Sequence, residues 1–242
     1  MERGSQKANL SLIVLFAGAS LSFGQEPVTY QVRHDHWRKG CDGVLTVTAG
    51  SVSFMGKKHA WTWKFDDIEQ LKLSDHDIGI TTYRDRLLRL GLDQQEQFTM
   101  KPGQDVRSAY RLLKDRMDQR LVVAAAFGNP EASSAIPAKL LGVIGGAQGV
   151  LELGEDWIAF RTPGPGESRT WRFTDIDNIA RTGPFRLTLV TFERGRAQYG
   201  DRKEFNFQLR QPLPETQYDA LWLRLNESKG LKILTTYKES MQ

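Results

Sequence analysis

Two histidines and the only cysteine of this chain are spaced in a way that would suit a metal ion. His34 and His36 are separated by one residue, and Cys41 follows shortly after them. Side chains of alternate residues in a β-strand point to the same side, so both imidazoles could face one ion while Cys41 completes three ligands. This mixture of nitrogen and sulfur suits copper or zinc. A metal or redox site at His34, His36 and Cys41 is therefore one hypothesis. The alternative is a cysteine that packs as an ordinary apolar residue.

Two further patterns resemble catalytic motifs, but each has a structural explanation. Asp67 and Glu69, like Asp175 and Asp177 later in the chain, could be carboxylate pairs for acid–base chemistry. Both pairs stand at the start of a strand pattern, where Asp commonly accepts hydrogen bonds from nearby backbone amides. The glycine-rich segment 142–149 runs into a strand pattern, whereas a dinucleotide-binding loop must open a helix. We therefore expect no enzymatic activity and no cofactor.

The chain contains two similar copies of one sequence pattern. Gly43–Phe54 recurs as Gly149–Phe160, 106 residues later, and Trp63–Leu71 recurs as Trp171–Ile179, 108 residues later. Solenoid repeats have periods of about 20–50 residues, so a repeat of roughly 110 residues indicates a duplicated domain. The two domains are expected at residues 28–127 and 136–240, and a polar linker is expected at 128–135.

Each copy begins with short alternating segments typical of β-strands and ends in a pattern with helical spacing. In the first copy the helical pattern covers 106–117, and in the second it covers 218–225. A further apolar segment follows each helix, Leu121–Phe127 in the first copy and Leu231–Tyr237 in the second. The strands expected in the first copy are Val28–Val32, Gly43–Val47, Ser51–Met55, Trp61–Phe65, Ile68–Leu73, Ile78–Tyr83, Leu87–Leu92 and Glu96–Met100.

Every second residue of Trp61–Phe65 is aromatic, which places three rings on one face of the sheet. The second copy keeps Trp171 and Phe173 at the matching positions, but it has Arg169 in place of Trp61. Trp63 and Phe65 are therefore expected in the core. Trp61 is the candidate for contact with a partner.

A run of strands closed by one amphipathic helix resembles the pleckstrin-homology-like (PH-like) fold. The Gly-x-Leu and Trp-x-Phe-x-Asp-Ile segments look like bacterial PH and GRAM-type members. The resemblance implies a mainly β fold, a β-barrel plus a C-terminal helix in each of two domains. It also implies a module that binds phospholipid head groups or proteins. Lipid-binding members carry Lys and Arg around the first hairpin, whereas Thr48–Gly50 and Gly154–Asp156 are the turns here. A multiply charged head group would lack its charged partners there.

The first residues differ in character from the rest of the chain. Arg3 and Lys7 precede a short apolar run that ends in small residues, as in a secretory signal peptide covering 1–24. The protein would then be secreted or periplasmic. An uncleaved membrane anchor through residues 8–24 is the alternative, although a membrane span usually needs about 20 mostly apolar residues.

The charge is nearly balanced, with 33 Lys and Arg against 29 Asp and Glu, a formal net charge of +4. Basic and acidic residues alternate, whereas a nucleic-acid-binding protein gathers its cations on one face. We therefore expect an exported, non-enzymatic module that binds a protein or peptide partner at the cell envelope and does not bind nucleic acid. A membrane-surface module that binds phospholipid, or the metal or redox protein above, remains open. The sequence indicates no oligomeric state.

Overall fold

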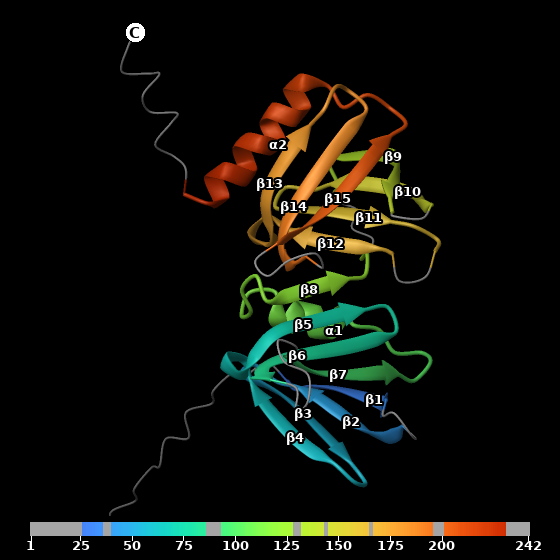
Figure 1. The fold of residues 1–242 in the computed structure, drawn as a ribbon, viewed down its shortest axis with the longest axis vertical. Helices are drawn as coiled ribbons and strands as arrows, with labels where there is room; N and C mark the ends of the chain where they lie inside the picture. Colours follow the sequence, from blue (N-terminus) through green and yellow to red (C-terminus); the bar gives the residue numbers. More distant parts are fainter. Residues whose placement is uncertain are drawn as a thin grey trace, which may run out of the picture.

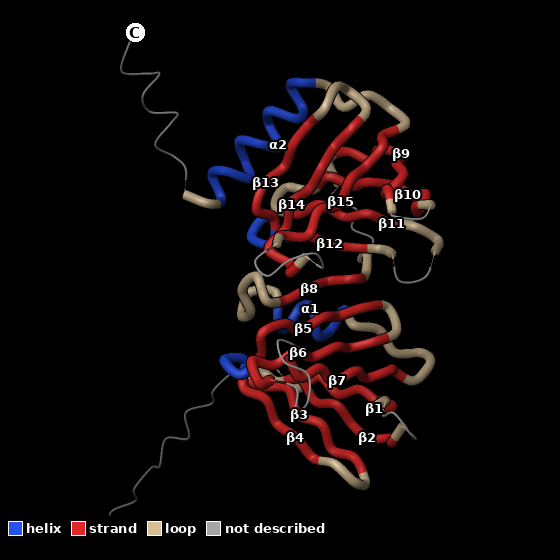
Figure 2. The backbone as a smooth tube through the Cα atoms, in the orientation of Figure 1, coloured by secondary structure: helices blue, strands red, loops and turns tan. Residues whose placement is uncertain are grey.

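The computed structural model describes residues 26–35, 40–85, 93–127, 132–142, 145–164, 167–195 and 201–230. The protein is mainly β, as expected, and its strands form one large sheet (Figures 1 and 2). The expected signal segment 1–24, the strand Leu87–Leu92 and the segment Leu231–Tyr237 lie outside the described residues. Half of the expected linker, residues 128–131, also lies outside them, and Ser134 and Ala135 belong to a strand.

The first half of the described chain runs from β1 to α1 and packs around one apolar core. Its strands alternate buried and exposed residues; in β1, for example, Tyr30, Val32 and His34 are buried. The elements are β1 (Val28–His34), β2 (Cys41–Val47), β3 (Ser51–Gly56), β4 (Ala60–Lys64), the 3-10 helix η1 (Phe65–Asp67), β5 (Ile68–Ser74), β6 (Asp77–Asp85), β7 (Asp93–Met100) and α1 (Arg107–Leu113).

The second half has the same order of elements and a core of its own. A separate strand, β8 (Leu121–Ala124), stands between the two halves. The elements of the second half are β9 (Ser134–Leu141), β10 (Gly146–Leu153), β11 (Trp157–Arg161), β12 (Arg169–Arg172), the 3-10 helix η2 (Phe173–Asp175), β13 (Ile176–Arg181), β14 (Arg186–Arg194), β15 (Arg202–Leu209) and α2 (Glu215–Ser228).

Strand pairing follows the same register in both halves. Val52 of β3 pairs with Trp63 of β4, and the matching Ile158 of β11 pairs with Trp171 of β12. Each half contributes seven strands in one order, β5-β6-β7-β1-β2-β3-β4 and β13-β14-β15-β9-β10-β11-β12. The ladder does not run from the last strand of a half back to its first, so the sheet is open. The expected closed barrels are therefore wrong as a description of the hydrogen bonding, because η1 and η2 turn the chain at the point where a barrel would close.

The two helices cover the cores as their periodicity predicts. Leu112 and Leu113 of α1 are buried, as are Leu221 and Leu225 of α2. Trp222 matches Leu113 by sequence but is 37% exposed. The two aligned positions therefore differ in burial. No helix in the described ranges is long and apolar enough to cross a membrane.

β8 joins the two halves into a single sheet of 15 strands (Figure 1). On one side it pairs in parallel with β5, where Leu71 stands opposite Leu121. On the other side Val123 of β8 pairs with Thr170 of β12 in antiparallel orientation. The segment after the first helix therefore packs on its own half and on the neighbouring half at once.

Candidate functional site

His34 and Cys41, two of the three expected metal ligands, stand directly opposite each other where β1 pairs with β2. The buried His34 ring shares a hydrogen bond between its Nε2 and Glu96 Oε2 at 2.6 Å. The ring also lies among Phe54, Trp61 and Phe98, with ring centroids 5.0–5.7 Å away. The aromatic rings and the Glu96 carboxylate therefore account for the burial of His34 without a metal ion.

The third expected ligand, His36, lies outside the described residues. Within the described ranges no group of three or more His, Cys, Asp or Glu side chains is placed to hold a metal ion. Cys41 is partly buried and packs against the first core. The metal hypothesis for His34, His36 and Cys41 therefore stays a prediction.

Trp61, the expected partner contact, is neither core nor fully exposed. It is half-buried on β4 and stacks on His59, with ring centroids 4.9 Å apart and an interplanar angle of 11°. Trp63, which was expected in the core, is also only half-buried, whereas Trp171 in the second half is 2% exposed. Both β4 tryptophans thus keep part of their surface open next to the end of the sheet.

Asp67 and Asp175 behave as the turn interpretation predicts, whereas Glu69 forms an ion pair with Arg194 and Asp177 with Arg202. Asp67 Oδ2 accepts a hydrogen bond from the Lys64 N–H at 3.3 Å, and Asp175 Oδ2 accepts one from the Arg172 N–H at 2.9 Å. Each carboxylate closes the 3-10 helix that leads into the next strand. The glycine-rich segment joins β9 to β10, and Gly145 and Gly146 adopt positive φ angles of 80° and 149° there.

Arg172 fastens the second half to the first. Its guanidinium donates to the carbonyls of Lys114 (2.5 Å), Met117 (3.0 Å) and Asp118 (2.8 Å), just beyond the end of α1. Carbonyls at and beyond a helix end lack intrahelical donors, and a cation can satisfy them. The Asp118 carbonyl also accepts a hydrogen bond from the Leu121 N–H at 3.2 Å. The same guanidinium forms an ion pair with Asp175, and both side chains are largely buried.

Thr170 makes the second side-chain contact of this junction. Its Oγ1 donates to the carbonyl of Ala125 at 2.7 Å, in a buried position next to the Thr170–Val123 strand pair. Thr170 and Arg172 alternate with Trp171 along β12, so the two face away from the second core. Together with the strand pair, they form the contact between β12 and the end of the first half.

β4 occupies the same position in the first half as β12 in the second, but no strand of the described chain pairs with its outer edge. The Gly56 N–H donates to the His59 carbonyl, and the Phe65 N–H donates to the Gly50 carbonyl. Because main-chain groups alternate in direction along an antiparallel strand, Thr62 directs its N–H and carbonyl outward.

The other end of the sheet, β13, is covered by side chains of its own half. The Ile179 N–H donates to Asn178 Oδ1 at 2.8 Å, and Tyr218 Oη donates to the Ile179 carbonyl at 3.2 Å. Lys229 Nζ donates to the Asp177 carbonyl. Covering of this kind blunts a sheet edge against further pairing. Of the two end strands of the described sheet, β4 is therefore the one whose outward main-chain groups, at Thr62, can pair with a further strand.

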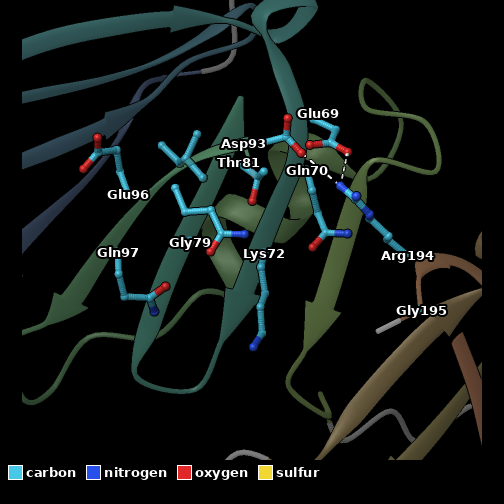
Figure 3. Close-up of a pocket in the computed structure, with 12 residues that line it drawn as sticks. Glu69, Gln70, Lys72, Gly79, Thr81, Asp93, Glu96, Gln97, Arg194 and Gly195 are labelled. Atoms are coloured by element: carbon cyan, nitrogen blue, oxygen red, sulfur yellow. Dashed lines mark hydrogen bonds and ion pairs between the residues drawn. The ribbon is translucent and has the colours of Figure 1, made fainter. Parts of the chain in front are cut away.

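A polar cavity of about 360 Å³ lies where β14 of the second half approaches β5, β6 and β7 (Figure 3). Arg194 reaches from the second half to Asp93 Oδ2 at 2.9 Å and to Glu69 Oε1 at 3.8 Å. Burial raises the pKa of Glu69, the neighbouring Asp93 carboxylate raises it further, and Arg194 opposes both. The cavity is bounded by Glu69, Gln70, Lys72, Gly79, Ile80, Thr81, Asp93, Gln95, Glu96, Gln97, Arg194 and Gly195.

Three charged residues of this cavity make contact between the halves. Glu69 and Asp93 face Arg194 across the junction (Figure 3). Sequence reasoning did not identify Arg172, Thr170 or Thr62, because each is an ordinary polar residue of a strand. The only signal was the repeat itself, which aligns Thr62 with Thr170.

Comparison with known proteins assigns no family. No protein-family model matches the sequence, and no curated protein matches it. Among solved structures, a chain in the structure of the Spt16D Pob3N heterodimer is similar to this protein with a TM-score of 0.32 and 10% sequence identity. The similarity covers 68% of this chain and 82% of that chain.

Proposed function

We propose that this protein is a non-enzymatic binding module that receives an extended segment of a partner protein along the outer edge of β4. One observation carries the proposal: β12, in the same position of the second half, already pairs with β8 at its outer edge, through Thr170 and Val123. An unpaired strand edge presents a row of donors and acceptors that an added strand satisfies. The chain thus contains one occupied example of the contact proposed for β4.

The side chains of β4 support an added strand on both faces. Trp61 and Trp63 are half-buried on the core side, and Thr62 and Lys64 are exposed on the other. Alternate side chains of a bound segment would extend the aromatic surface of Trp61 and Trp63. We therefore propose that Trp61, whose ring lies beside the β4 edge, contacts the partner.

We further propose that the halves are two PH-like domains that arose by duplication of one domain. The repeated order of elements supports this proposal, as does the identical pairing of Val52 with Trp63 and of Ile158 with Trp171. Duplication would explain why one strand position is occupied in the second half and open in the first.

Export to the cell envelope belongs to the same proposal and rests on residues 1–24 alone. A reporter enzyme that is active only outside the cytoplasm should become active when fused behind these residues. Mass spectrometry of the exported protein should then find a new N-terminus near residue 25. An inactive reporter would contradict export, and an uncleaved N-terminus would favour the anchor through residues 8–24.

The binding edge can be tested with a synthetic peptide of residues 119–127, the segment that already pairs with β12. Fluorescence anisotropy should detect binding of the labelled peptide to the full chain. Thr62→Pro should abolish this binding, since proline removes the outward N–H and its ring obstructs the edge. Thr62→Val is the matched control, because it keeps the backbone donor and should reduce affinity by less than about tenfold, or 1.4 kcal/mol.

Circular dichroism and thermal unfolding should show that both variants fold, because proline is tolerated on edge strands. Equal binding by the wild type and a folded Thr62→Pro variant would place the peptide elsewhere and contradict the proposed edge. Absence of binding to the wild type would contradict it as well.

A further inference from the structure

We infer that the segment received by β4 is residues 231–237 of a second copy of this chain, so that copies join head to tail. This inference rests on the proposed function, because it names the partner for the same edge. It starts from the junction inside the chain, where the segment following α1 pairs with β12 of the next half. A segment following α2 would pair with β4 of the next copy in the same way.

The sequence provides a matching segment in the right place. Leu231, Ile233 and Tyr237 follow α2 as Leu121, Val123 and Phe127 follow α1, at a constant offset of 110 residues. Leu121 and Val123 are buried in the core of their own half, where β8 also pairs with β5, and Val123 pairs with Thr170 of the receiving half. Residues 231–237 lie outside the described residues, so the inference concerns their sequence and their place after Gly230.

The receiving edge retains the side chains that fasten the internal junction. Thr62 stands where Thr170 donates to the Ala125 carbonyl, and its hydroxyl could donate to an incoming carbonyl in the same way. Lys64 stands where Arg172 satisfies the carbonyls beyond α1. A lysine at this position can meet the carbonyls at the end of α2 in the preceding copy.

The topology directs this contact to a second molecule. β13 and β4 are the two opposite ends of the 15-stranded sheet, and α2 packs beside β13 (Figure 1). The outward groups of Asp177 and Ile179 on β13 are engaged by Asn178, Tyr218 and Lys229. Pairing of residues 231–237 with β13 of their own chain would displace these contacts. On β4 the outward Lys64 N–H is engaged by Asp67, but the matching Arg172 N–H is engaged by Asp175 on β12, which nevertheless pairs with β8.

A contact between two different surfaces does not close on itself as a two-fold dimer does. Head-to-tail joining therefore predicts species that grow with concentration, and it predicts that the two surfaces can be blocked separately. Deletion of 231–242 removes the donor segment and leaves β4 intact. Thr62→Pro blocks the receiving edge and leaves the donor segment intact.

Sedimentation velocity over a concentration series should test the inference with the full chain. The wild type should form species larger than a dimer, whereas each blocked variant should stay monomeric. A mixture of the two blocked variants should form a 1:1 complex, because one supplies the edge and the other the segment. Lys64→Glu in the otherwise unchanged chain should weaken self-association about tenfold, because its carboxylate would repel the helix-end carbonyls. This variant tests the receiving edge without introducing proline.

Three outcomes would overturn the inference. These are a wild type that is monomeric throughout, a deletion variant that still dimerises through paired β4 edges, and blocked variants that do not combine. A peptide of residues 229–238 separates this failure from failure of the proposed function. If the 119–127 peptide binds β4 and the 229–238 peptide does not, the edge receives partner strands but the partner is not a second copy.

Discussion

At the residue scale, some charged groups of this protein lie where its halves meet. Arg194 bridges Glu69 and Asp93 of the first half, and Arg172 is paired with Asp175. Surface ion pairs contribute little, while partly buried pairs depend strongly on both partners. The behaviour of these groups with pH therefore reports on the junction.

Glu69→Gln should change how stability depends on pH. Because the pKa of Glu69 is raised in the folded state, its contribution to stability is present in full below the pKa of the unfolded chain. That contribution is lost as pH rises through the raised pKa. The variant lacks this loss, so its stability relative to wild type should increase from about pH 4 to neutral pH and then level off.

Urea unfolding at a series of pH values would measure that difference. A difference that stays constant with pH would show that Glu69 titrates in the folded protein as it does in the unfolded chain. A difference that falls with rising pH would show that Arg194 outweighs burial and Asp93.

At the element scale, the hairpins of the two halves depend on glycines where strands come close. A Cβ at Gly43 would lie 2.5 Å from the Met55 carbonyl oxygen and 2.5 Å from the Phe54 ring. At the matching Gly149, a Cβ would lie 2.1 Å from the Arg161 carbonyl oxygen. The repeated Gly-Val-Leu segment therefore marks a steric requirement of the sheet.

Gly43→Ala should destabilise the protein by about 1–3 kcal/mol, because the methyl group must push back strand β3 and the Phe54 ring. Gly50→Ala is the matched control, since nothing lies within 4 Å of a Cβ at Gly50. It should change stability by less than about 0.5 kcal/mol. Equal effects of the two substitutions in thermal unfolding would contradict the steric explanation.

At the scale of the whole molecule, two separate cores are connected through β8, Arg172 and Arg194. β8 supplies the backbone pairing, and Arg172 ties the end of α1 to η2. Cooperative unfolding of both halves therefore depends on a small number of contacts, and removing the central cation should uncouple them.

Arg172→Met should cost about 3–5 kcal/mol, because it leaves the buried Asp175 carboxylate without its cation and removes a donor from the carbonyls of Lys114, Met117 and Asp118. Differential scanning calorimetry should then resolve two transitions in place of one. In the double variant with Asp175→Asn, part of the lost stability should return, since the uncompensated charge is gone. A single unchanged transition in Arg172→Met would show that the strand pairing alone couples the halves.

The sequence by itself predicted the mainly β fold, the strands of the first half, both helices and the turn role of Asp67 and Asp175. These features depend on local alternation, helical spacing and short-range hydrogen bonds, which a sequence displays directly. Of the eight strands expected in the first half, seven were observed, and the eighth, Leu87–Leu92, lies outside the described residues. The sequence also aligned Thr62 with Thr170 through the repeat.

Only the tertiary structure decided which strand edges are occupied and how the halves are joined. β8 pairs with β12 across the junction, and Arg172 reaches carbonyls more than fifty positions away in the chain. Edge occupation depends on which segments meet in space, and two edges with matching sequences can have different neighbours. The physical reason is that strand pairing uses main-chain groups, which are the same in every residue and leave no pattern in the sequence.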